Sequence, residues 1–167
     1  MVGLRLLRCK HWFFVVAVLL PPSPVYAQSV DAALAALARG DHAAALNILQ
    51  PLAEQGHALA QLNLGLIHDN GRGVARDHAA ALKWYRLAAV QGNAGAQRHL
   101  GELYYDGLGV TQNTARAYVW LHLAAAAGDA RAARYRDLAA RRLKPPQVAE
   151  AQKVASACQL KAFAGCS

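Results

Sequence analysis

The chain has 167 residues, of which 55% are apolar, 17% charged and 7% aromatic, and its formal net charge is +8. This composition is too apolar for a disordered chain and too poor in aromatic and β-branched residues for a β-sandwich, while its many alanines favour helix. Residues 1–27 carry +3, 28–115 carry −1 and 116–167 carry +6, so the body of the chain is near neutral and nucleic acid is not the expected partner.

The N-terminus reads as a secretory signal peptide over residues 1–27. Three basic residues precede an apolar run of 9 residues over 12–20, and prolines follow it. A small-x-Ala pattern places the cleavage site between Ala27 and Gln28. Because a membrane span needs about 20 apolar residues, we expect export to the periplasm or beyond, with no stable membrane insertion after cleavage.

Residues 28–56 read as an N-terminal cap. A helix is expected over 30–38, and a second from Asp41 to Gly56. Pro51 lies inside that second segment and is expected to kink the helix or to reset its start.

Residues 57–128 repeat with a period of 36. When 56–91 is compared with 92–127, 15 of 36 positions are identical. A period of this length with helical patterning indicates stacked supersecondary units. The glycines and tryptophans in this repeat framework are Gly65, Gly71, Gly73, Trp84, Gly92, Gly101, Gly107, Gly109, Trp120 and Gly128.

Each unit is predicted to contain two helices, over 58–69 and 77–91 in one copy and over 94–105 and 113–127 in the next. Asp77 and Asn113 are candidate N-caps, and the glycine after each helix suits a left-handed turn. Gly65 and Gly101 lie inside helices, where glycine is unfavourable, which suggests a close helix approach. The expected facing surfaces are the alanine pairs at 88–89 and 124–125.

Residues 129–167 read as a C-terminal cap, with helices expected over 130–144 and 147–160 on either side of two prolines. Asp137 stands where the repeat has glycine and is expected to pair with Arg134 and Arg141. Only Cys158 and Cys166 remain after signal removal. In an oxidising compartment they are expected to form a disulfide that fixes the C-terminus locally.

The repeat resembles the Sel-1-like repeat family, a subclass of tetratricopeptide-like solenoids. One copy matches the family motif at Ala58, Ala60, Leu64, Gly65, Gly71, Gly73, Val74, Asp77, Ala81, Trp84, Tyr85, Ala88, Ala89 and Gly92. The other matches it at Ala94, Ala96, Leu100, Gly101, Tyr104, Gly107, Gly109, Val110, Ala117, Trp120, Ala124, Ala125 and Gly128. The resemblance implies an all-α helical solenoid of about seven helices, with repeats over 57–92 and 93–128 between helical caps.

The sequence offers little for catalysis or metal binding. The Gly-x-Gly loops follow helices and have no adjacent Lys-Ser or Lys-Thr, so we interpret them as turns and not as phosphate loops. No histidines lie at ligand spacing, and no catalytic triad or carboxylate pair is present. We therefore expect no cofactor, no metal and no enzyme activity. The alternative is a periplasmic enzyme acting on cell-wall material or β-lactams, as described for cysteine-rich relatives, although this chain lacks S-x-x-K.

Binding is the function that the resemblance favours. By analogy with tetratricopeptide grooves, the exposed positions for a peptide or protein partner are Leu62, Leu66, Asp69, Arg98, Glu102 and Tyr105. A second candidate is a basic docking patch for an acidic partner, formed by Arg131, Arg134, Arg141 and Arg142. Two other interpretations stay open: the basic residues form only a solvated face, or the chain is a structural subunit of an envelope complex.

Overall fold

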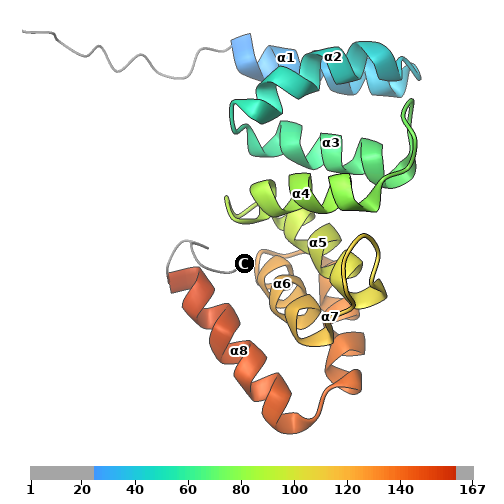
Figure 1. The fold of residues 1–167 in the computed structure, drawn as a ribbon. Helices are drawn as coiled ribbons and strands as arrows, with labels where there is room; N and C mark the ends of the chain where they lie inside the picture. The colour runs from blue at the N-terminus through green and yellow to red at the C-terminus, as the bar shows by residue number, and fades with distance from the viewer. Residues whose placement is uncertain (1–24, 161–167) are drawn as a thin grey trace, which may run out of the picture.

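The computed structural model describes residues 25–160, and within this range it contains eight helices and no strand. The helices are α1 (Val25–Ala38), α2 (His42–Glu54), α3 (Ala58–Asn70), α4 (His78–Ala89), α5 (Ala94–Asp106), α6 (Thr114–Ala126), α7 (Ala130–Arg142) and α8 (Pro145–Leu160). Consecutive helices from α1 to α7 pack against one another in a single stack, and α8 lies across α6 at the far end (Figure 1). The predicted all-α solenoid is confirmed, with eight helices where about seven were expected.

Two features of the N-terminal cap differ from expectation. α1 begins at Val25 and not at Val30, so it runs across the predicted cleavage site, while the basic and apolar parts of the predicted signal peptide lie outside the described residues. α2 is one helix that starts at His42 and continues through Pro51. The expected reset does not occur: the proline removes one i→i−4 hydrogen bond, the one to the Asn47 carbonyl, and only the last turn of α2 follows it.

The helix starts are fixed by side-chain caps at the predicted positions. Asp77 accepts a hydrogen bond from the backbone N–H of Ala80, and Asn113 accepts one from Arg116, each at 2.9 Å. These bonds satisfy donors that the first turn of a helix leaves without a partner. The same arrangement recurs at three further helix starts, at Asp41, Asn93 and Asp129.

The two glycines of each Gly-x-Gly loop serve different purposes. Gly71 and Gly107 end α3 and α5 in the left-handed conformation, with φ of 66° and 74°. The second glycine lets the loop lie against the start of an earlier helix: a Cβ on Gly109 would be 2.6 Å from the backbone nitrogen of Ala79. A Cβ on Gly73 would overlap His42 at the start of α2, which is the residue equivalent to His78 one period earlier. The loops are therefore packing elements between repeats.

The close helix approach at Gly65 and Gly101 is confirmed, but the expected facing residues were wrong. A Cβ on Gly65 would overlap the ring of Tyr85, and a Cβ on Gly101 would lie 2.6 Å from Cγ of Leu121. Tyr85 and Leu121 are themselves one period apart. The missing side chains therefore make room for a large residue of the second helix, and not for contact between small surfaces.

The buried side chains form two clusters along the stack. One lies in α1, α2 and α3 and includes Leu49, Leu64 and Ile67; the other extends from α4 to α8. Trp120 is only 2% exposed within the second cluster. Trp84, at the equivalent position, is half-buried and packs against the first cluster. The two indoles thus pack between helices as predicted, but to different depths.

The C-terminal cap departs from the repeat. α8 packs on α6 and makes few contacts with α7, whereas in each earlier unit the second helix packs closely on the first. Asp137 occupies the glycine position of α7, so a close approach such as that of Leu121 to Gly101 is blocked. Asp137 pairs with Arg136 at 2.7 Å, and not with Arg134 or Arg141 as predicted.

Candidate functional site

The first helices of the repeats present equivalent positions on one side of the stack. One row across them contains Leu59, Gly95 and Arg131; the next contains Leu62, Arg98 and Arg134; the third contains Leu66, Glu102 and Leu138. Side chains join the helices: Leu62 lies beside Gly95, and Arg98 of α5 bonds Asp129 at the start of α7. We call these nine residues the α3–α5–α7 face.

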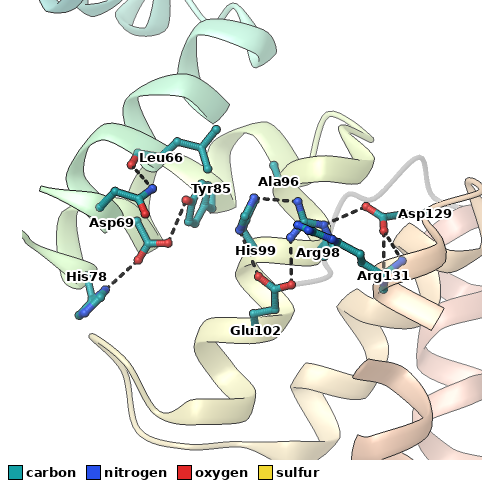
Figure 2. A network of polar contacts seen from close by, with 12 residues as sticks. Leu66, Asp69, His78, Tyr85, Ala96, Arg98, His99, Glu102, Asp129 and Arg131 are labelled. Atoms are coloured by element: carbon teal, nitrogen blue, oxygen red, sulfur yellow. Dashed lines mark hydrogen bonds and ion pairs between the residues drawn. The ribbon is translucent and has the colours of Figure 1, made fainter. Parts of the chain in front are cut away.

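Arg98 is the centre of a charged network on this face (Figure 2). Its Nη1 donates to Glu102 Oε1 at 2.9 Å, and its Nε donates to Asp129 Oδ2 at 3.0 Å. The side chain is only 13% exposed. Burial alone would lower the pKa of Arg98, but the two carboxylates outweigh burial and raise it. Arg98 is therefore a fixed cation that links α5 to α7.

The two carboxylates are held ionised by the same contacts. Burial would raise the pKa of Glu102, but hydrogen bonds from His99 and Arg98 outweigh it and the pKa is lowered. Burial would also raise the pKa of Asp129, but the backbone N–H of Ala132 and the charge of Arg98 lower it. Both oxygens of Asp129 are in use, since Oδ1 caps α7 while Oδ2 accepts from Arg98.

His99 connects this network to the preceding repeat. Its Nδ1 lies 3.1 Å from Glu102 Oε2, and its Nε2 lies 2.9 Å from Arg98 Nη2. Because a guanidinium can only donate, Nε2 is the acceptor, so Nδ1 carries the proton that goes to Glu102. The imidazole stacks on the ring of Tyr85, with centroids 5.0 Å apart.

A second polar cluster continues the network toward α3. Asp69 Oδ1 lies 2.8 Å from Nδ1 of His78, and its Oδ2 accepts from the Tyr85 hydroxyl at 3.2 Å. Burial, together with the charge of Asp69, raises the pKa of Tyr85, so the hydroxyl remains a neutral donor. Figure 2 shows this cluster and the Arg98 network on either side of the stacked Tyr85 and His99 rings.

A hollow of about 440 Å³ opens between α5 and α7. It is lined by Arg98, His99, Glu102, Arg131, Arg134 and Tyr135. Arg131 and Arg134 are exposed, and neither forms an ion pair with a carboxylate of the described residues. Three arginines against the carboxylates of Glu102 and Asp129 leave the hollow with one positive charge in excess. It can bind an anionic group by charge-assisted hydrogen bonds.

An aromatic contact borders this hollow. Tyr105 and Tyr135 meet edge to face with centroids 6.1 Å apart. The guanidinium of Arg142 lies over the Tyr105 ring, 4.0 Å from its centroid. Tyr105 is only 7% exposed, so the expectation that it is an exposed groove residue was wrong: α7 and Arg142 cover it.

The structure brings the two predicted sets of binding residues together. Arg98 and Glu102 from the predicted groove, and Arg131 and Arg134 from the predicted basic patch, line one hollow. Leu62 and Leu66 are half-buried, Asp69 is used within the protein, and Arg141 is exposed. Sequence reasoning missed His99, Asp129 and Tyr135. The period of 36 could have placed them, since it aligns His99 with Tyr135 and Asp129 with Asn93.

The rest of the described chain offers fewer candidates. An apolar pocket of about 280 Å³ between α6 and α8 is lined mainly by Ala115, Val119, Ala151 and Val154. Among residues 25–160 there is no group of three His, Cys, Asp or Glu side chains placed to hold a metal ion. No helix in this range is long and apolar enough to cross a membrane. Cys158 is buried in α8, while Cys166 lies outside the described residues, so their disulfide stays a prediction.

Comparison with known proteins identifies the repeat. The family model of the Sel1 repeat matches residues 58–93 and 94–129. A Sel1 repeat protein from Oxalobacter formigenes is 32% identical, with a TM-score of 0.61, over 67% of this chain and 87% of that one. A protective antigen present in uropathogenic Escherichia coli strains, which displays an SLR fold, is 27% identical, with a TM-score of 0.76, over 83% of this chain. This chain spans only 32% of that antigen's length. A search of curated proteins finds no match.

Proposed function

Because the chain belongs to the Sel1 repeat family, whose fold is typically a non-enzymatic scaffold for protein interactions, we propose that it is a binding module that holds a peptide or protein partner on its α3–α5–α7 face. The observation that carries this proposal is the hollow between α5 and α7. Its floor is ordered by the Arg98 network, while Arg131 and Arg134 extend from its rim without a carboxylate partner among the described residues.

A rigid floor favours binding because the side chains do not have to be ordered when the partner arrives. Arg98 is held by two carboxylates and by His99, and His99 is held by stacking on Tyr85. The leucines of α3 extend the same face, and Leu59 is 45% exposed. Arginine and tyrosine are enriched among the residues that contribute most to binding at protein interfaces, and Arg131, Arg134 and Tyr135 line the hollow.

Site-specific photo-crosslinking tests the location of the partner. A photoreactive phenylalanine at Leu59 or Leu138 would report the α3–α5–α7 face, and one at Leu87 of α4 provides a control of similar exposure. Discrete adducts are expected from the first two positions in cells that produce the chain, and not from the third. Equal adducts from Leu87, or none from either face position, would contradict the proposal.

We further propose that the module works in the cell envelope. The support is the sequence of residues 1–27, with its basic start, apolar run and small-x-Ala site. N-terminal sequencing of the chain from fractionated cells is expected to give Gln28 as the first residue, in the exported fraction. An intact N-terminus in the cytosolic fraction would show that the chain is not exported.

A further inference from the structure

The chemistry of the α3–α5–α7 face changes in one direction along the stack. On α3 the positions are leucines, with Leu59 exposed and Leu62 half-buried. On α7 the positions in the same two rows are Arg131 and Arg134, both exposed. In these two rows the face thus has an apolar end on α3 and a basic end on α7, which a ligand of uniform polarity would not match, while the third row ends on Leu138, which is exposed on α7.

The middle of the face is low and carries no uncompensated positive charge. Gly95 stands between Leu59 and Arg131 in its row and has no side chain to fill the space. Arg98 stands between Leu62 and Arg134, but its charge is compensated by Glu102 and Asp129. The middle helix therefore provides a surface across which a chain can pass, and does not itself select a charge.

The two arginines at the basic end have no carboxylate partner among the described residues. The nearby carboxylates of Glu102 and Asp129 are already occupied by Arg98, by His99 and by the N-terminus of α7. Arg131 and Arg134 are one helical turn apart and border the hollow beside Tyr135. A guanidinium pairs with a carboxylate through two parallel hydrogen bonds, so a pair of arginines here is suited to the side chain of Asp or Glu.

We propose that the α3–α5–α7 face binds an extended peptide segment that places an apolar side chain over Leu59 and Leu62 and an acidic side chain between Arg131 and Arg134. The inference rests on the proposed function and names the chemistry of its partner. Neighbouring first helices meet where Leu62 lies beside Gly95 and where Arg98 bonds Asp129; at a spacing of about 10 Å for each such contact, α3 and α7 are separated by about 20 Å. At about 3.3 Å per residue, the two recognised side chains are about six residues apart.

The first experiment selects peptide ligands without assuming their sequence. A phage-displayed library of random twelve-residue peptides is selected on the purified full chain. Enriched peptides are expected to carry Asp or Glu about five to seven positions from Leu, Ile, Val or Phe. A representative is then synthesised with acetylated and amidated ends, so that no terminal charge contributes, and its binding is measured by fluorescence anisotropy.

Matched variants assign the two ends of the face. The double substitution Arg131→Gln and Arg134→Gln is expected to weaken binding at least tenfold, and so is Leu59→Ser. Replacing the peptide's acidic residue by its amide should cost about as much as the arginine substitutions. Arg76→Gln and Leu87→Ser change exposed residues outside the face and should leave the affinity unchanged. Circular dichroism confirms that each variant is folded.

The outcomes separate this inference from the proposed function. Enriched peptides that bind through the face but lack an acidic residue would overturn the inference and leave the proposed function standing. Loss of binding with the arginine substitutions alone, and none with Leu59→Ser, would also overturn it, because the face would then bind polyanions without regard to apolar contacts. If no peptide is enriched, the inference is wrong, and the photo-crosslinking experiment then decides whether a protein partner binds the face. If peptides bind but no substitution on the face changes their affinity, both are wrong.

Discussion

Gly101 shows how a single missing side chain fixes the distance between two helices. In a helix interior glycine is about 1 kcal/mol less favourable than alanine, so Gly101→Ala would stabilise α5 if the helix stood alone. In the stack, the new Cβ would lie 2.6 Å from Cγ of Leu121 and 3.2 Å from the carbonyl oxygen of Ala117. We expect Gly101→Ala to lower the free energy of unfolding by about 1–3 kcal/mol, measured by urea denaturation.

Gly95→Ala on the same helix is the matched control. The atoms nearest to its Cβ would be the methyl groups of Leu62, at 3.2 Å or more, and Oδ1 of Asn93 at 3.4 Å. Leu62 is half-buried and can shift, so this variant is expected to be neutral or slightly stabilising. Equal effects at Gly95 and Gly101 would mean that helix propensity, and not the approach of α6, decides the outcome.

Glu102 makes stability depend on acid pH. Its pKa in the folded protein is lowered from the ordinary value of 4.5. A carboxyl group with a lowered folded pKa contributes stability that is complete above its unfolded pKa and is lost as the pH falls through the folded pKa. Asp129 acts in the same direction, from an ordinary value of 3.8. We therefore expect the free energy of unfolding to decrease as the pH falls below about 4.5.

Urea denaturation of Glu102→Gln between pH 7 and pH 3 measures this contribution. The variant should be less stable at pH 7, since Arg98 and His99 lose a charged partner, and its stability should fall less steeply in acid. Glu150→Gln, which changes an exposed carboxylate on α8, is the control and should follow the parent chain. A parent-like acid profile in Glu102→Gln would show that the Arg98 network does not determine acid sensitivity.

At the scale of elements, helix starts depend on one side chain each. Asp77 caps α4 through the backbone N–H of Ala80, and Asn113 performs the same task for α6 one period later. Asp77→Ala is expected to cost about 1 kcal/mol of stability, because it leaves an N–H of the first turn without a partner. Asp77→Asn should cost little. Thermal unfolding of both variants tests this, and a similar loss for both would point to charge and not to the cap.

The sequence predicts these elements well because the two repeats carry the same helix signals at equivalent positions. The N-caps, the closing glycines and the 36-residue period all agree, and the observed ends of α3 and α5 differ from the predicted ones by one residue. What the period does not give is which side chain of the second helix faces Gly65 or Gly101. That choice depends on the angle at which the two helices cross. The sequence does not give this angle, so it does not decide between nearby candidates such as Tyr85 and Ala88.

The placement of α8 was not predicted for a similar reason. A continued repeat would pack α8 on α7, but Asp137 stands where that contact needs glycine. α8 instead packs on α6, with Ala151, Ala155 and Cys158 buried and Gln152 donating to the Tyr118 hydroxyl at 3.0 Å. The substitution at 137 was visible in the sequence, but the surface that accepts the displaced helix exists only once the helices before it have folded.

The candidate site was predicted in its residue types and not in its connections. Arg98 and Glu102 were expected in a groove and the arginines of α7 in a separate patch, because single helices were considered one at a time. The ion pair between Arg98 and Asp129 joins residues that are 31 positions apart. Contacts of this kind follow from stacking of the repeats, so they become predictable only when equivalent positions on successive first helices are placed side by side.

For the whole molecule, the stack implies that stability varies along its length. Each helix contacts mainly its neighbours, so local stability follows the number and size of the neighbours that a helix buries. α1 packs mainly on α2, and among its described side chains the buried ones are Val30, Ala33 and Ala36. α5 and α6 pack on each other and on both adjoining helices, and they bury Leu100, Tyr104, Trp120 and Leu121.

Native-state hydrogen exchange should therefore show that amide protection varies along the stack and is not uniform. Small buried side chains contribute less to local stability than leucine or tryptophan. We therefore expect amides in the middle of α1 to exchange at least tenfold faster than amides in the middle of α5 and α6. A factor of ten corresponds to about 1.4 kcal/mol. α8 should be intermediate, because it is terminal but buries Cys158 and two alanines against α6. If α1 and α6 are protected equally, the two buried clusters unfold as one unit, and the α3–α5–α7 face would be stabilised by the whole stack instead of by its central helices alone.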